Sequence, residues 1–274
     1  MGLFGFGKKK KEKVEKVEKV QNRDTGSFVG FVLLSEPIWD KAQFVKDFML
    51  DWGIDISNFD REDKKYKDHL VVEQDDMLLT ISFLDAPVPD GEAEHYAAAN
   101  YMWPDAVEII SGHKAQILVL AVGEDDDLLE IGELFTKAVA TCLKQRYAVG
   151  VYTDGAVFQP EFYREFSMVM KEDQIPIMNW IWFGIYCDEK QEGIYTYGMK
   201  KFGKDEMEVY VDKSGANLNE VREFLMSIVA YVLESDVILH DGETIGFSEN
   251  QRLPITRSKG VALEGDTLKI GYKG

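Results

Sequence analysis

The sequence predicts an α+β protein built from two successive halves, each with two helices on one face of a mostly antiparallel sheet. The chain has 274 residues, 45% of them hydrophobic, which is enough for one large or two modest domains with a sizeable core. Short apolar runs alternate with stretches of helical spacing, in an order that twice resembles the split βαβ plan of ferredoxin-like folds. No linker rich in Pro, Gly or Ser separates the halves, so we expect them to pack together; a single continuous mixed sheet is the alternative.

Three segments are expected along the chain. The first is a basic, disordered tail, the second is the first α+β half, and the third is the second half with a β-rich C-terminal tail. Their boundaries are 1–26, 27–146 and 147–274.

The tail is predicted from its charge, because residues 8–20 hold seven Lys and three Glu. Leu3, Phe4 and Phe6 precede these lysines. Apolar side chains beside lysines favour a second interpretation, in which residues 1–20 make weak contact with an anionic membrane surface.

In the first half, apolar runs of strand length alternate with segments of helical spacing. Pro104 disfavours the α-helical region at Trp103, so the helical segment there is expected as two pieces that meet near this residue. The expected strands are 28–34, 70–73, 78–84 and 115–122, and the expected helices are 40–52, 92–112 and 125–145.

In the second half, Asn217 followed by Glu220 resembles a capping box, and the segment after it has strong helical periodicity. Pro160 is expected to open another helix, after a loop over 153–159. The expected helices are 160–171 and 217–233; the expected strands are 148–152, 178–187, 193–201 and 207–211, followed by short strands and turns over 236–272.

The charge of the chain disfavours nucleic acid as a partner. With 49 acidic and 31 basic side chains the formal net charge is −18, and the residues outside 8–20 carry −22. Such a body repels a polyanion and attracts a basic protein partner.

Cysteine usage and hydropathy predict a cytoplasmic protein. Cys142 and Cys187 lie far apart and form no CxxC motif, which is typical of a reducing compartment. We find neither a secretory signal nor an apolar stretch of transmembrane length in the sequence.

The sequence contains no motif that assigns a reaction. GxSxG, GxGxxG and GxxxxGK are absent, and the four histidines form no HxH or HExxH pair. We therefore predict no cofactor and no metal site.

Two positions are candidate binding sites. Thr153 and Asp154 follow a predicted strand, where α/β sheets often bind ligands; a plain Asp-Gly turn is the alternative. At the helix break, Asn100 is expected to satisfy backbone groups freed by Pro104, while Trp103 forms either a pocket wall or a core plug. His113 follows this region and either binds a ligand or caps helical carbonyls.

Several segments resemble a bacterial family known as domain of unknown function 4261, over about residues 30–272. The closing segment is also similar to the domain of suppressor-of-fused proteins, whose bacterial relatives include immunity proteins of toxin systems. The first resemblance carries no catalytic assignment to these residues, and the second implies a toxin-like partner. The motifs are Asn-Tyr-Met-Trp-Pro at 100–104, Asn-Trp-Ile-Trp-Phe-Gly at 179–184, Asp-Gly-Glu-Thr-Ile-Gly-Phe at 241–247 and Leu-Pro-Ile-Thr-Arg-Ser at 253–258.

Together these observations favour a non-catalytic cytoplasmic protein whose acidic surface binds a basic or toxin-like protein, in an immunity-type or regulatory role. The alternative is a hydrolase or lyase that uses Asp154 with His95 or His113.

Overall fold

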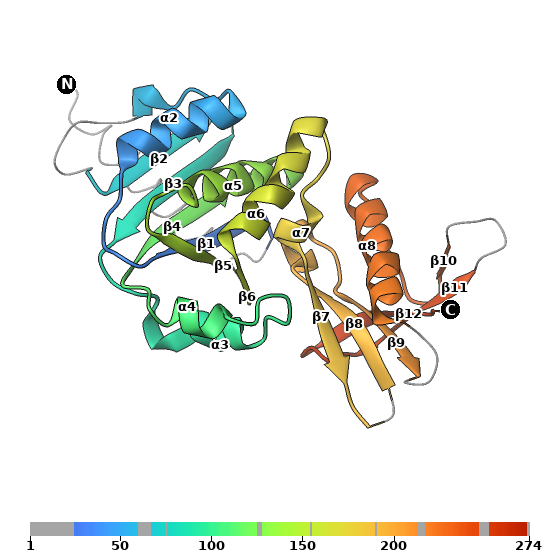
Figure 1. Cartoon of the computed structure of the whole chain (residues 1–274). Helices are drawn as coiled ribbons and strands as arrows, with labels where there is room; N and C mark the ends of the chain where they lie inside the picture. The colour runs from blue at the N-terminus through green and yellow to red at the C-terminus, as the bar shows by residue number, and fades with distance from the viewer. Residues whose placement is uncertain are drawn as a thin grey trace, which may run out of the picture.

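Two six-stranded sheets lie side by side, with helices packed on them (Figure 1). This arrangement confirms the predicted α+β class. The computed structural model describes residues 25–59, 67–74, 76–124, 128–153, 155–189, 191–212, 217–246 and 252–272.

The first sheet is antiparallel throughout and has the strand order β2-β3-β4-β1-β5-β6. Its inner strand β1 has the sequence Ser-Phe-Val-Gly-Phe-Val-Leu-Leu, which is apolar at nearly every position because both faces are covered. The strands are β1 (Ser27–Leu34), β2 (His69–Gln74), β3 (Met77–Leu84), β4 (Ala115–Val122), β5 (Ala148–Thr153) and β6 (Ala156–Phe158).

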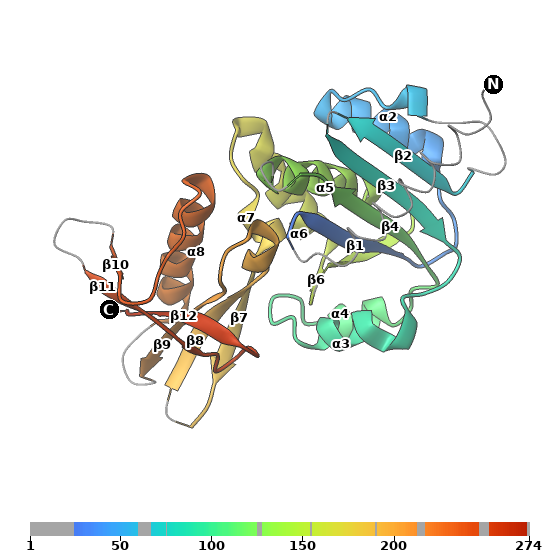
Figure 2. The same ribbon diagram turned by 180° about the vertical axis from the view of Figure 1, so that it is seen from behind.

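Helices cover both faces of the first sheet, which corrects the prediction that they lie on one face (Figure 1 and Figure 2). One face packs against α2 (Lys41–Trp52) and α5 (Leu128–Cys142). The other face, which includes Leu33, packs against α3 (Glu92–Ala98) and α4 (Ala106–Ile110). Successive residues of a strand point to opposite faces, so an apolar β1 creates two faces that each need a helical layer.

The second sheet has the order β10-β11-β12-β9-β8-β7, in which only β12 and β9 pair in parallel. The long helix α8 (Leu218–Glu234) packs against this sheet through an apolar stripe that includes Val221, Leu225 and Ile228. The strands are β7 (Trp182–Cys187), β8 (Gln191–Tyr197), β9 (Met207–Asp212), β10 (Thr244–Ile245), β11 (Leu253–Lys259) and β12 (Asp266–Ile270).

The finer prediction of two ferredoxin-like halves is not confirmed. The first sheet contains one split βαβ unit, β4-α5-β5, because β4 and β5 both run antiparallel to the β1 strand between them. The second sheet has one long helix where the plan requires two. Element order alone does not determine which strands become neighbours, so the pattern could not fix this detail.

The division between the sheets falls after β6, which corrects the boundary predicted at residue 146. β5 pairs with β1, and β6 pairs with β5 through a tight turn at Gly155, whose φ is 78°. Residues 178–187, predicted as one strand, instead form the end of a short helix, α7, followed by β7. The remaining helices are α6 (Pro160–Ser167), α7 (Ile177–Trp180) and the 3₁₀ helices η1 (Ser57–Phe59), η3 (Pro89–Gly91), η4 (Met168–Glu172) and η5 (Met199–Phe202).

The two sheets share one hydrophobic core, with Trp180 at their junction. Its indole N–H donates to Thr136 Oγ1 of α5 at 2.8 Å, and its ring centroid is 5.0 Å from that of Phe202. Just before β1, the amide of Gly26 donates to the carbonyl of Lys201 at 3.1 Å. These contacts tie the start of the first sheet to the second.

Candidate functional site

Three of the predicted site residues lie in one layer, the segment of residues 85–113 that contains α3 and α4. We call this segment the α3–α4 layer. Figure 1 shows α3 and α4 against the first sheet. The buried side chains of this layer and the sheet form a small core separate from the main core. The three residues are Asn100, Trp103 and His113.

Asn100 fixes the break between α3 and α4. Its Nδ2 donates to the carbonyl of Val157 at 2.6 Å, and its Oδ1 accepts from the amides of Met102 at 2.9 Å and Trp103 at 3.1 Å. A buried amide that binds three backbone groups holds the turn against β6. This geometry gives Asn100 a structural role and leaves little of it free for a ligand.

Trp103 is a core plug and not the wall of a pocket. Its side chain is 7% exposed and packs in the small core beside Ile110. Gly150 of β5 makes room for it, because a Cβ there would lie 2.7 Å from Ile110 Cδ1 and 3.4 Å from Trp103 Cη2.

His113 uses both ring nitrogens within the fold. Nε2 accepts from the amide of Val88 at 2.9 Å, so it carries no proton. The proton therefore lies on Nδ1, which donates to the carbonyl of Ile110 at 2.6 Å. Glu94 Oε1 lies 3.6 Å from Nδ1. The ring thus caps the end of α4 and anchors the segment before α3.

The structure does not bring Thr153 and His113 together. Thr153 pairs with Gly30 in the middle of β1, whereas Ala115, two residues after His113, pairs with Leu34 at the end of β1. Four residues along a strand separate Gly30 from Leu34 by about 13 Å.

The remaining residues of the predicted catalytic pair are His95 and Asp154. His95 is exposed on α3, where its ring stands edge-on to Tyr96. Asp154 lies outside the described residues, as do residues 1–20 with their predicted membrane contact.

The outer surface of the α3–α4 layer is acidic. No Lys or Arg occurs between Lys67 and Lys114. Within the part of the chain that the structure describes, no lysine or arginine forms an ion pair with any carboxylate of this layer. We call these carboxylates the acidic face: Asp85, Asp90, Glu92, Glu94, Asp105 and Glu108.

Apolar side chains are exposed among the carboxylates of the acidic face. Val107 is 42% exposed and Ile109 39% exposed on α4, and Tyr101 is 39% exposed at the helix break. Aliphatic and aromatic side chains beside uncompensated charge are typical of a protein-binding surface.

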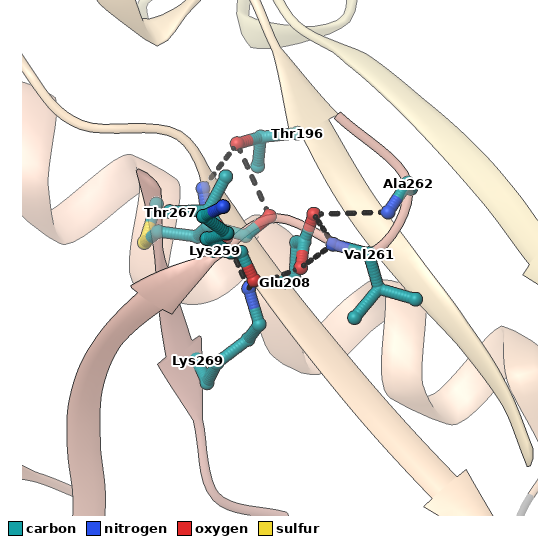
Figure 3. Close-up of polar contacts among 8 residues, drawn as sticks. Thr196, Glu208, Lys259, Val261, Ala262, Thr267 and Lys269 are labelled. Atoms are coloured by element: carbon teal, nitrogen blue, oxygen red, sulfur yellow. Dashed lines mark hydrogen bonds and ion pairs between the residues drawn. The ribbon is translucent and has the colours of Figure 1, made fainter. Parts of the chain in front are cut away.

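A second polar centre, which the sequence analysis missed, lies in the second sheet at Glu208 (Figure 3). Its side chain is fully buried on β9, and its Oε2 lies 2.5 Å from Nζ of Lys269, the residue opposite on β12. The amides of Val261 and Ala262 donate to the same carboxylate at 3.2 and 3.3 Å. Figure 3 shows Glu208 between these loop amides and the ammonium group of Lys269.

Like Glu208, Lys269 contacts only groups inside the fold among the described residues. Besides Glu208, its ammonium group donates to the carbonyl of Lys259 at 3.0 Å and to the hydroxyl of Thr267. The centre therefore fastens the loop between β11 and β12 onto the sheet, and it leaves no open position for a substrate.

Glu206 forms a separate buried site next to this centre. Its Oε2 accepts from the hydroxyl of Thr196 at 2.7 Å, and its Oε1 accepts from the amide of Gly198 at 2.9 Å. Thr196 in turn accepts from the amide of Met207 at 2.8 Å. Glu206 therefore holds the turn that leads from β8 into β9.

Glu208 left only a weak signal in the sequence. It stands between Met207 and Val209, and Lys269 stands between Leu268 and Ile270. This alternation indicates two opposite charges on the polar faces of two strands. That these strands are neighbours follows only from the fold.

No three His, Cys, Asp or Glu side chains of the described segments lie close enough together to hold a metal ion. Among the helices that the structure describes, none has the length and apolarity needed to cross a bilayer.

Comparison with known proteins identifies one family. Residues 195–271 match the model of a domain of unknown function (DUF4261), which confirms the predicted resemblance for this segment; over residues 30–194 it stays a prediction. The matched segment contains Glu206, Glu208, Lys269 and the whole of α8. No curated protein and no solved structure matches the chain. The similarity to the suppressor-of-fused domain stays a prediction.

Proposed function

Because residues 195–271 belong to a family of unknown function, we propose a function from the structure itself: the chain is a cytoplasmic, non-catalytic binding protein whose acidic face docks a basic surface of a partner protein. The observation that carries this proposal is the acidic face, with six carboxylates and no lysine or arginine in the same layer. Its uncompensated charge would steer a basic partner into contact, and the exposed Val107 and Ile109 would add apolar contact area.

The state of the buried polar groups supports binding over catalysis. His113, Glu206 and Glu208 each use their polar atoms to hold backbone segments in place. A catalytic acid or base needs a group within reach of a substrate proton, and these groups face inward.

A toxin domain with a basic surface is one class of partner that fits. The predicted resemblance of the closing segment to the suppressor-of-fused domain favours this class, because bacterial relatives of that domain include immunity proteins of toxin systems. Reducing conditions suit the chain, because Cys142 and Cys187 are both free thiols.

Neutralising the acidic face tests the proposal. The variant carries four substitutions at exposed positions: Asp85→Asn, Asp90→Asn, Asp105→Asn and Glu108→Gln. A matched control changes the charge equally on the other side of the first sheet: Glu161→Gln, Glu165→Gln, Glu172→Gln and Asp173→Asn. The match includes backbone geometry, because Asp90 and Asp173 both have positive φ, at 59° and 55°.

The experiment compares proteins captured from lysate of the native cell and then measures association rates with the purified partner. We expect the control to retain a basic protein that the acidic-face variant loses, with an association rate lower by about tenfold or more. A partner retained equally by both variants, or an association rate unaffected by salt, would contradict the proposal.

A further inference from the structure

A cavity of about 300 Å³ opens in the second half of the chain, between η5, the C-terminal end of α8 and β12. Apart from Thr25, every residue that lines it falls within the segment matched to the family model. This size is at the lower end of the range for small-molecule sites. The cavity is therefore formed almost entirely by the segment that matches the family model.

The inner wall of the cavity is apolar. Met207 of β9, Val232 of α8 and Leu268 of β12 line it, and all three are buried. The segment after α8 forms the outer wall with Ile238 and Leu239. Ile238 is 59% exposed, which is unusual for an aliphatic side chain beside a hydrophobic cavity.

The polar side of the cavity is cationic. Lys200 and Lys204 line it, and within the described residues Lys200 has no acidic partner. Lys204 binds Asp236 at 2.6 Å, but this carboxylate is 94% exposed and readily exchanged. The remaining acid, Asp205, already pairs with Arg257 at 3.1 Å. Two lysines on one cavity stand out in a chain with a net charge of −18.

We propose that this cavity binds a small amphipathic carboxylate, with the carboxylate at Lys200 and Lys204 and the hydrocarbon part against the inner wall. The cavity has room for roughly ten water-sized groups, at about 30 Å³ each. A straight-chain or aromatic acid of about that many non-hydrogen atoms fits this space. The ligand carboxylate replaces Asp236 as the partner of Lys204. This site lies apart from the acidic face and goes beyond the proposed function.

Titration of the full chain with sodium octanoate, followed by calorimetry, tests the site. We expect one saturable site, and much weaker binding of 1-octanol and octylammonium, which share the hydrocarbon chain but lack the negative charge. The double substitution Lys200→Gln with Lys204→Gln should weaken octanoate binding by at least tenfold, because two charge-assisted contacts are lost. Lys46→Gln, on an exposed lysine of α2, is the control and should leave binding unchanged.

The side chain of Lys204 is largely buried, so its substitution also changes packing. A second variant therefore tests the site without changing Lys204. Ile238→Glu places a negative charge on the outer wall at an exposed position, so the fold is expected to persist. Ile38→Glu is its control, since Ile38 is 53% exposed and lies in the first half. We expect Ile238→Glu to abolish octanoate binding and Ile38→Glu to retain it. Absence of saturable binding by the natural chain, equal affinity for 1-octanol, or full binding by Ile238→Glu would overturn the proposal.

Discussion

Glu206 and Glu208 are two residues apart, yet their pKa values are shifted in opposite directions. Burial raises the pKa of Glu206, and the hydrogen bond from Thr196 offsets only part of this effect. Burial acts in the same direction on Glu208, but hydrogen bonds from Lys269 and the amide of Val261 outweigh it and lower the pKa. The cation accounts for the difference: Glu208 has one and Glu206 has none among its contacts.

Replacing Glu208 by Gln should destabilise the fold in a pH-dependent way. At pH 7 we expect the free energy of unfolding to fall by about 3 kcal/mol, because the Lys269 ammonium loses its buried partner. A carboxyl whose folded pKa is below its unfolded value stabilises above that unfolded value, near 4.3, and the contribution is lost as pH falls through the folded pKa. Urea unfolding from pH 7 down to pH 3.5 should therefore show the gap between natural chain and variant narrowing in acid.

Glu206→Gln is the matched control for this experiment. The folded pKa of Glu206 is raised, so the neutral acid is favoured in the fold and ionisation becomes costly as pH rises through that value. As pH rises from acid to neutral, the free energy of unfolding of this variant should therefore increase relative to that of the natural chain. Glu208→Gln should show the opposite trend. If the free energy of unfolding changed with pH in the same direction for both variants, the ion pair with Lys269 would not be the cause of the opposite pKa shifts.

Whether the sequence predicts the role of a residue depends on whether its partners are near or distant in the chain. The role of Asn100 at the helix break follows from its spacing to Trp103 and Pro104, since the two amides that its Oδ1 accepts from lie within three residues. Glu208 and Lys269 are far apart in the chain, and their contact depends on the parallel pairing of β9 with β12. No local pattern contains that information.

At the scale of elements, the second sheet places tyrosine rings over glycines of the neighbouring strand. Gly184 is paired with Tyr195, and Gly193 with Tyr210. A Cβ at Gly184 would lie 2.1 Å from Tyr195 Cζ, and one at Gly193 would lie 2.7 Å from Tyr210 Cδ1. Each ring covers the backbone that a side chain would otherwise protect, which stabilises glycine-containing strands.

Gly193→Ala should destabilise the second sheet. The added Cβ would also lie 2.3 Å from the carbonyl oxygen of Val209, a backbone atom that cannot rotate away. We expect the free energy of unfolding to fall by about 2 kcal/mol, within the range for overpacking. Gly112→Ala is the control, because its Cβ would lie 3.5 Å from the nearest backbone atom, and we expect a change below about 0.5 kcal/mol. If Gly193→Ala and Gly112→Ala had equal thermal unfolding midpoints, close packing at Gly193 would not be needed for the stability of the second sheet.

Elements with strong periodicity were predicted well, and those formed by tertiary pairing were not. The strand over 115–122 has the predicted bounds, and the helix predicted over 217–233 is Leu218–Glu234. β6 is three residues long and exists because β5 pairs with it. The stretch before β7 has the apolar composition of a strand, but Trp180 turns towards α5 and the backbone there is helical.

At the scale of the whole molecule, the two halves differ in charge. Residues 27–158, which end with β6, contain 25 acidic and 10 basic side chains, whereas residues 159–274 contain 20 and 13. The acidic face lies in the first half and the lysine-lined cavity in the second. Since the two surfaces attract ligands of opposite charge, each proposal can fail without the other.

Because the two sheets share one core, we expect them to unfold as a single unit. The indole of Trp180 donates to the buried Thr136 across the junction, and Gly132 of α5 lets its ring approach, since a Cβ there would lie 3.1 Å from it. Trp180→Phe removes the donor and leaves Thr136 Oγ1 without it, so we expect a loss of about 2 kcal/mol. We expect this loss of stability to affect both sheets, because each sheet contributes buried residues to the same core.

Two probes can follow the sheets separately. Cys187 is exposed on β7 and Cys142 is buried, so a thiol-reactive fluorophore will label the second sheet selectively. Far-ultraviolet circular dichroism reports both sheets. We expect the two denaturant transitions to coincide in the natural chain and to shift together in Trp180→Phe. A label transition that separates from the dichroism transition would mean that the second sheet unfolds by itself, and that the Trp180 junction is a contact between independent domains.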